Sequence, residues 1–216
     1  MTSRASRKRS PLHCGRPLVL ASASPRRAWL LREAGIEAEV VPPPPEVEET
    51  VPQASSPVDA AMMAARAKAL AVARLRPDAL VLGADTVVAI GERILGKPAD
   101  AAEACAMLRD LAGRAHEVYT ALAYAASLGS EAKILAEDVV SSEVVFRQLS
   151  EEEIAAYVAT GEPADKAGAY AIQGEAGRFV AQLKGAWDNV VGLPVARAVE
   201  LLTQVRLELS RLEEDG

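Results

Sequence analysis

The sequence predicts an α/β domain built on a mixed sheet. The N-terminal half alternates short apolar strands with helices, which is typical of parallel pairing, whereas residues 116–146 form a long β-rich run around a turn, which is typical of antiparallel pairing. No linker divides the chain, and half of its 216 residues are apolar, enough for one substantial core. We therefore expect a single domain over residues 17–210.

The first 16 residues differ from the rest in charge. They hold five basic residues and no acid, although the whole chain has a formal net charge of −6. We expect this segment to be a disordered extension. The acidic body argues against an extended nucleic-acid surface, so no nucleic-acid partner is expected. An interaction of the basic segment alone with nucleic acid stays open.

Cellular location is predicted from what the sequence lacks. The apolar run at residues 18–21 is shorter than the roughly 7–15 residues of a signal-peptide core. No stretch approaches the ~20 apolar residues that cross a membrane. Cys14 and Cys105 show no disulfide or zinc spacing. We expect a cytoplasmic protein without a membrane partner.

The first part of the chain predicts a strand, loop and helix followed by a second such unit. PLVLAS is a buried strand, and Ser24 caps a helix that has Pro25 at its first position and ends at Gly35. IEAEVV is a second strand that runs into a stiff, extended PPPPEVEET loop. A helix then begins after Ser56, with Pro57 and Asp59 in its first turn.

The remaining elements follow from similar signals. DALVLGADTVVAI is strongly β-forming, but GAD is expected to interrupt it and to leave Asp85 and Thr86 at a strand end. Capping patterns predict helices over 100–113 and 150–161, separated by two or three antiparallel strands that turn near 128–130. Short strands and a long amphipathic helix follow, with an inward face listed here as Val195, Val199, Leu202, Val205 and Leu209.

The SASPRR stretch, residues 22–27, predicts an anion site. A helix N-terminus favours acidic residues, yet Arg26 and Arg27 occupy this first turn. Free backbone N–H groups, two guanidinium groups and the hydroxyls of Ser22 and Ser24 together suit a phosphate chain. Surface arginines paired with distant carboxylates are the alternative. An ordinary P-loop is excluded because its glycine-rich motif is missing.

Other polar residues could complete such a site. Asp85 and the acidic end of the proline-rich loop offer the oxygen ligands that magnesium or manganese prefers. Lys68 and Lys97 could reach phosphates, and Gln173 could be a buried reader of polar ligand edges. Each also has an ordinary explanation as a turn residue or a solvated charge.

Several motifs, in order, resemble the Maf family of nucleoside triphosphate pyrophosphatases. They run from about Leu18 to about Leu202 and comprise SASPRR, the ET after the prolines, ARAKA, LGADTVV, ILGKPAD, HEVYTALA, TGEPADKAGAYAIQG and NVVGLPV. The resemblance implies a two-lobed mixed α/β fold with a central cleft, similar to inosine triphosphate pyrophosphatases. It implies a divalent metal cofactor and hydrolysis of a nucleoside triphosphate to the monophosphate and pyrophosphate.

The resemblance also assigns roles by position. Ser22, Ser24, Arg26 and Arg27 would hold the triphosphate, with further phosphate contacts from Lys68 and Lys97. Glu49 and Asp85 would bind the metal, and Asp85 would also act as general base. Thr86 and Gln173 would lie near the nucleobase and the metal and would influence specificity.

The resemblance also bears on the substrate and the biological role. DKAGAYAIQG resembles the subgroup that acts on dTTP and UTP rather than the subgroup that acts on 7-methyl-GTP. A house-cleaning enzyme of the nucleotide pool is the leading hypothesis. A nucleotide-binding regulator of division septum formation is the alternative, and a homodimer is a family expectation.

Overall fold

The computed structural model describes residues 15–49 and 54–214, with the side chains of 48–49 and 212–214 excluded. Residues 1–14 lie outside this range, so the predicted extension is not tested there. Arg16, which was assigned to it, donates hydrogen bonds to the carbonyl oxygens of Pro77 and Ser127. Within the described residues, no helix is long and apolar enough to cross a membrane.

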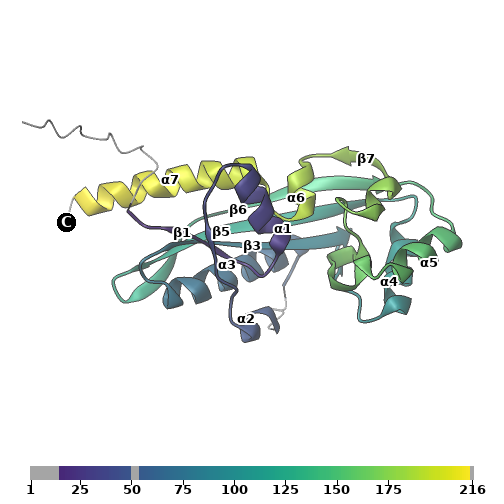
Figure 1. Ribbon diagram of the computed structural model, residues 1–216, viewed down its shortest axis with the longest axis horizontal. Helices are drawn as coiled ribbons and strands as arrows, with labels where there is room; N and C mark the ends of the chain where they lie inside the picture. Colours follow the sequence, from purple (N-terminus) through teal and green to yellow (C-terminus); the bar gives the residue numbers. More distant parts are fainter. Residues whose placement is uncertain (1–14, 50–53, 215–216) are drawn as a thin grey trace, which may run out of the picture.

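One seven-stranded sheet organises the chain, as Figure 1 shows. In chain order the elements are β1 (Leu18–Ala21), α1 (Pro25–Glu33), β2 (Glu39–Val40), α2 (Pro45–Glu49), α3 (Pro57–Leu75), β3 (Leu80–Ile90), β4 (Arg93–Leu95), α4 (Ala101–Leu111), β5 (Ala115–Leu128), β6 (Glu131–Phe146), α5 (Glu151–Ala159), the 3-10 turns η1 (Glu162–Asp165), η2 (Ala167–Ala169) and η3 (Glu175–Phe179), β7 (Val180–Lys184), α6 (Trp187–Val191) and α7 (Val195–Glu214).

The sheet mixes parallel and antiparallel pairing, which confirms the predicted fold class. Its order is β2-β1-β3-β5-β6-β7, and β4 pairs with β3 separately. β1 is parallel to β2 and β3, whereas β3, β5, β6 and β7 are successively antiparallel. The run 116–146 is a single two-stranded hairpin in which Leu128 pairs with Glu131 across a tight turn.

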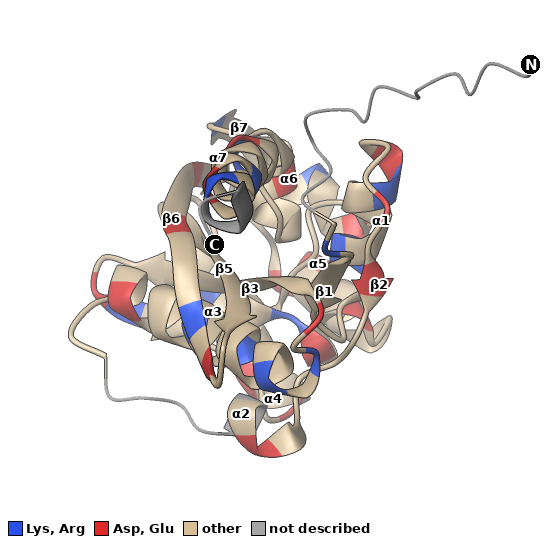
Figure 2. Cartoon of the chain, turned by 90° about the vertical axis from the view of Figure 1, so that its left-hand side faces the viewer, with Lys and Arg blue, Asp and Glu red and all other residues tan. Residues whose placement is uncertain are grey.

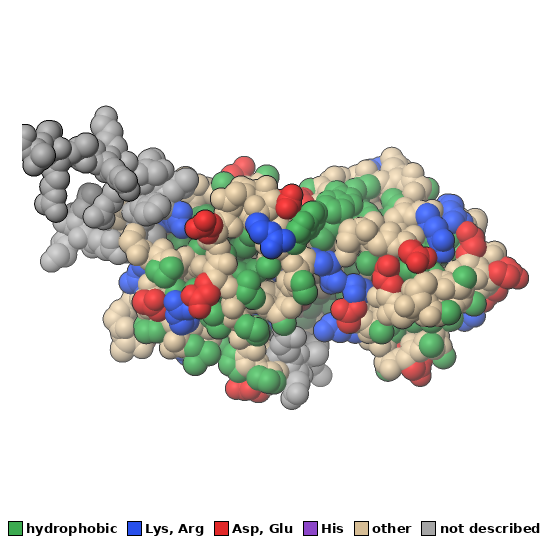
Figure 3. Space-filling view, in the orientation of Figure 1, with side chains coloured by type: hydrophobic (Ala, Val, Ile, Leu, Met, Phe, Trp, Pro, Cys, Tyr) green, Lys and Arg blue, Asp and Glu red, His purple; other side chains and the backbone are tan. Residues whose placement is uncertain are grey.

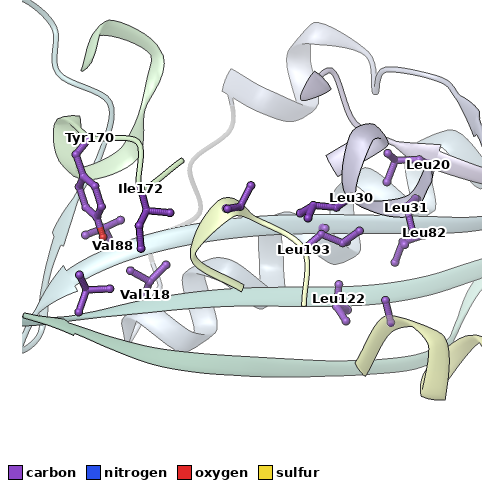
Figure 4. Packing of buried hydrophobic residues seen from close by; sticks show 14 of the residues in the cluster. Leu20, Leu30, Leu31, Leu82, Val88, Val118, Leu122, Tyr170, Ile172 and Leu193 are labelled. Carbon is purple, nitrogen blue, oxygen red and sulfur yellow. The ribbon is translucent and has the colours of Figure 1, made fainter. Parts of the chain in front are cut away.

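The long strands carry a core on each face. On one face α3 packs against alternate residues of β3 and β5 through its alanines. On the other, α1, α6 and α7 cover a larger cluster that reaches to Tyr170 and Ile172 (Figure 4). Figure 2 shows α3 and α7 on opposite sides of the strands. The long strands run along the longest axis of the molecule in Figure 1, with α4 and α5 at one end.

Four local predictions were wrong. β3 runs without a break through Gly83 and Asp85. PEVEE forms the short helix α2 instead of an extended loop, because Pro45 stands at a first helical position and the glutamates after it are good helix formers. Only Glu39 and Val40 of IEAEVV form a strand. Val199 is 37% exposed, while Leu202, Val205 and Leu209 are buried as expected.

Capping explains how several helices begin. Ser56, Asp100 and Ser150 each accept a hydrogen bond from the backbone N–H three residues later, as predicted. Ser24 occupies the N-cap position of α1 but makes no side-chain cap bond. The first turn of α1, where the anion site was expected, is therefore not capped by the side chain of Ser24.

Candidate functional site

A gap along one edge of β3 locates the candidate site. β1 pairs with β3 only as far as Gly83, and β4 joins the same edge at Val88. The residues between them, Asp85 and Thr86 included, are flanked by β5 on the other edge alone. The end of a parallel strand that diverges from its neighbour is a common place for a ligand in α/β proteins.

A cavity of about 280 Å³ opens at this gap. Figure 3 shows lysine and arginine side chains gathered around a hollow in the middle of the molecule. Nine of the ten residues predicted for the site line this one cavity: Ser22, Ser24, Arg26, Arg27, Lys68, Asp85, Thr86, Lys97 and Gln173. They come from α1, α3, β3 and three loops, so the fold brings together residues far apart in sequence.

Asp85 forms an ion pair with Lys68. The distance from Lys68 Nζ to Asp85 Oδ1 is 2.8 Å, and both side chains are largely shielded from solvent. Asp85 points toward α3 because its neighbours of the same parity on β3 face the alanine-rich cluster. Gly83 permits the close approach, since a Cβ there would lie 2.3 Å from the Ala65 carbonyl oxygen. The lysine thus holds the carboxylate at the cavity wall.

Arg27 lines the cavity and also donates hydrogen bonds to other parts of the protein. It is 8% exposed and donates to Gly192 O at 2.8 Å, Ser22 Oγ at 3.2 Å and Thr86 Oγ1 at 3.1 Å. Ser22 Oγ also accepts from the Ser24 backbone N–H. Arg27 therefore ties α1 to the loop after β1, to β3 and to the loop after α6.

Thr86 lies on the opposite face of β3 from Asp85. Its hydroxyl is 3.0 Å from that of Thr120, which in turn donates to the Asn189 carbonyl oxygen at 2.8 Å. Asn189 is fully buried and donates to Val118 O and Ser142 Oγ. This polar network fixes the floor of the cavity against α6.

The far wall comes from the segment after α5. Asp165, Lys166 and Tyr170 line the cavity there, and none of them was among the predicted site residues. Lys166 forms an ion pair with Asp165, and its ammonium, with a smaller effect from Arg26, holds the pKa of the Asp165 carboxyl below its usual value. A charged pair inside the glycine-rich DKAGAY segment was the available signal.

Three cavity groups make no hydrogen bond or ion pair within residues 15–49 and 54–214. They are the guanidinium of Arg26, the ammonium of Lys97 and the side-chain amide of Gln173. Gln173 is exposed at the wall, which corrects the expectation that it is buried. Two cations and an amide that line one cavity, without hydrogen-bond or ion-pair partners among the described residues, suit a polar, anionic ligand.

The residues at the cavity include a carboxylate, that of Asp85, that could bind a divalent cation. Asp85 Oδ1 accepts from Lys68, whereas Oδ2 has no hydrogen-bond donor in the described part of the chain, and Asp85 lines the cavity. Magnesium is commonly held by one or two carboxylates together with substrate phosphates. Glu49 ends α2, but its side chain lies outside the described atoms.

Comparison with known proteins places this chain in a family. Residues 17–205 match the family described as Maf-like protein. The "dTTP/UTP pyrophosphatase" of Bacillus cytotoxicus is 50% identical over 186 residues, covering 86% of this chain and 94% of its own. That of Pelotomaculum thermopropionicum is 46% identical over 185 residues with the same coverage, and that of Bacillus cereus strain AH820 is 46% identical over 200 residues, covering 90% and 98%.

A solved structure, that of a HAM1 protein from Coxiella burnetii, aligns with 93% of this chain and all of its own at 16% identity and a TM-score of 0.41. The match to the family over residues 17–205 and the identity of nearly half across most of the chain lead to one conclusion: the chain belongs to the Maf family.

Proposed function

We propose that this chain hydrolyses dTTP, UTP and modified pyrimidine nucleoside triphosphates to the monophosphate and pyrophosphate, and so cleanses the nucleotide pool. The names of its relatives support this substrate class. The observation that carries the proposal is a cavity that sets the uncommitted cations Arg26 and Lys97 beside the carboxylate Asp85. A protein that only binds a polyanion gains nothing from a carboxylate facing it, whereas hydrolysis requires a proton acceptor.

The positions of the residues around the cavity suggest a role for each in the reaction. A triphosphate carries about four negative charges, and Arg26, Lys97 and the first-turn N–H groups of α1 would offset them. Asp85, held by Lys68, would accept a proton from water as the water oxygen bonds to the α-phosphorus. The bond from that phosphorus to the bridging oxygen breaks, and pyrophosphate leaves.

Asp85, with Glu49 if its side chain reaches the cavity, would hold magnesium or manganese. A bound cation would offset phosphate charge and acidify a bound water. Cytoplasmic location and a homodimer belong to the same proposal. The location rests on the sequence, which lacks a signal-peptide core and any disulfide or zinc spacing of its cysteines, and the homodimer rests on the family resemblance.

The direct test is pyrophosphate release from dTTP, UTP, CTP, GTP and 7-methyl-GTP with magnesium or manganese. We expect dTTP and UTP to be the best substrates. A preference for 7-methyl-GTP would reassign the substrate, and saturable nucleotide binding without release from any of them would favour the regulatory alternative.

Substitution Asp85→Asn tests the assigned base. Turnover should fall by about 10²–10⁴-fold, the usual contribution of a general base, while the circular dichroism spectrum stays that of the wild type. Near-normal turnover in the folded variant would remove Asp85 from the mechanism.

A further inference from the structure

Gln173 stands on a tight turn at the cavity wall. The Gly174 backbone N–H donates to the Ala171 carbonyl oxygen at 3.0 Å, which closes the turn around Ile172 and Gln173. Because the Gln173 side chain has no partner among the described residues, the backbone of this turn alone sets where its amide can reach.

One carboxylate lies behind both flanks of the turn. Glu162 Oε2 accepts from the Glu175 backbone N–H at 3.2 Å, and Glu162 Oε1 accepts from the Tyr157 hydroxyl at 2.7 Å. The same hydroxyl accepts from the Ala171 backbone N–H at 3.2 Å. Burial, and then the Glu162 carboxylate, raise the pKa of Tyr157, so its hydroxyl keeps the proton that it donates.

Packing leaves this arrangement little freedom. Tyr157 is fully buried and contacts the Phe179 ring edge to face at 5.2 Å. A Cβ at Gly174 would lie 2.3 Å from Glu162 Oε1, so the carboxylate rests directly on the turn. On its other side, Glu162 follows Gly161, whose φ of +77° reverses the chain at the end of α5.

We propose that Glu162 and Tyr157 are positioning residues that hold Gln173 in place for the nucleotide. Neither side chain is among those that line the cavity, so both act through the backbone of residues 171–175. The inference rests on the proposed function for its kinetic consequence, but the restraint on the turn is a property of the ligand-free protein.

Amide hydrogen exchange of the ligand-free protein tests the restraint. The protection factor of Ala171 should fall in Tyr157→Phe, and that of Glu175 should fall in Glu162→Gln, because a glutamine cannot accept at both oxygen positions. Glu175→Gln is the matched control, since it removes an acid from the same turn and leaves the backbone bond to Glu162 intact. Unchanged protection in both test variants would overturn the proposal.

A double-mutant cycle with Gln173→Ala tests the consequence for the nucleotide. Alone, Glu162→Gln should lower kcat/KM for dTTP by roughly tenfold or more, as expected for a misplaced group. In the Gln173→Ala background, Glu162→Gln should lower kcat/KM by less than about twofold, because the group that Glu162 positions is no longer present. Glu175→Gln should change kcat/KM by less than about twofold relative to its parent, both in the wild type and in the Gln173→Ala background. Equal losses in the two backgrounds would mean that Glu162 acts only on general stability.

Failure of the proposed function is distinguishable from failure of this inference. If the wild type binds dTTP without releasing pyrophosphate, the proposed hydrolysis is wrong. The same cycle is then measured as dissociation constants by calorimetry, with non-additive losses supporting the positioning role and additive losses overturning it.

Discussion

Arg26 and Arg27 are neighbours of the same type with different tasks. Both stand in a helix turn where the backbone dipole disfavours positive charge. For Arg27, the acceptors on Gly192, Ser22 and Thr86 offset that cost in the ligand-free protein. Arg26 has no such bond among the described residues, so a ligand is the expected source of its compensation.

We therefore expect the two arginine variants to separate stability from binding. Arg27→Ala should lower the free energy of unfolding by about 2–4 kcal/mol, since it breaks a buried hydrogen-bond network and leaves the acceptors of that network without a donor. Arg26→Ala should change it by less than about 0.5 kcal/mol yet raise KM for dTTP at least tenfold. Urea unfolding and pyrophosphate-release kinetics measure these values. Equal destabilisation by both variants would contradict the division of tasks.

His116 predicts how stability depends on pH. It is 2% exposed, its Nε2 is 2.8 Å from the Tyr170 hydroxyl, and burial lowers its pKa from 6.5 to about 4. The unfolded chain therefore gains a proton before the folded protein does. The stabilisation is complete above pH 6.5 and is lost as the pH falls toward 4, about 3 kcal/mol in total.

Urea unfolding between pH 7 and pH 4.5 checks this expectation. His116→Gln should show a shallower fall in the free energy of unfolding across that range, whatever its stability at pH 7. His13, in the undescribed N-terminal segment, is common to both proteins and cancels in the comparison. Parallel pH profiles would show that His116 is not responsible.

At the scale of elements, the sequence predicted most helices and strands because capping residues and apolar periodicity are local signals. It misread β3, since a glycine within a β-rich run is typical of a break. Here Gly83 lets α3 pack closely on an unbroken strand, a contact between elements that no local pattern contains. The same contact sets Lys68 beside Asp85.

Gly83→Ala should therefore disturb both packing and chemistry. The added Cβ meets backbone atoms of α3, so the helix must shift, at a cost of about 1–3 kcal/mol in the free energy of unfolding. Because the shift separates Lys68 from Asp85, kcat should fall as well. Gly96→Ala is the matched control, since nothing lies within 4 Å of a Cβ there and its φ is ordinary. An active, stable Gly83→Ala protein would show that close helix packing is not needed.

At the scale of the whole molecule, the candidate site was predictable to the extent that its residues belong to ordered motifs. Nine predicted residues meet in one cavity. The role of Arg27 as a buried connector was not predictable, because its acceptor on Gly192 is 165 residues away in sequence. Asp165 and Lys166 were missed for a related reason: only the folded chain brings the segment after α5 opposite α1.

The two tryptophans of the chain lie where α1 and α6, which are far apart in sequence, come into contact. Trp29 of α1 and Trp187 of α6 are the only tryptophans in the chain, and their rings lie edge to face at 6.3 Å, each about 40% exposed. Arg26 precedes Trp29 by one helical turn, and Val190 and Val191 of α6 line the cavity. A nucleotide bound between these elements should therefore change the environment of both rings.

We expect tryptophan fluorescence to change saturably when a dTTP analogue with a non-hydrolysable α,β bridge is added. Arg26→Ala should shift the titration to at least tenfold higher concentration, because the phosphate contact is lost, while the final amplitude stays similar. Trp187→Phe should retain binding by calorimetry and lose much of the signal, which assigns the change to the pair. Binding by calorimetry with unchanged wild-type fluorescence would mean that the ligand contacts neither α1 nor α6 near these rings, and that the cavity at the β3 edge is not where the nucleotide binds.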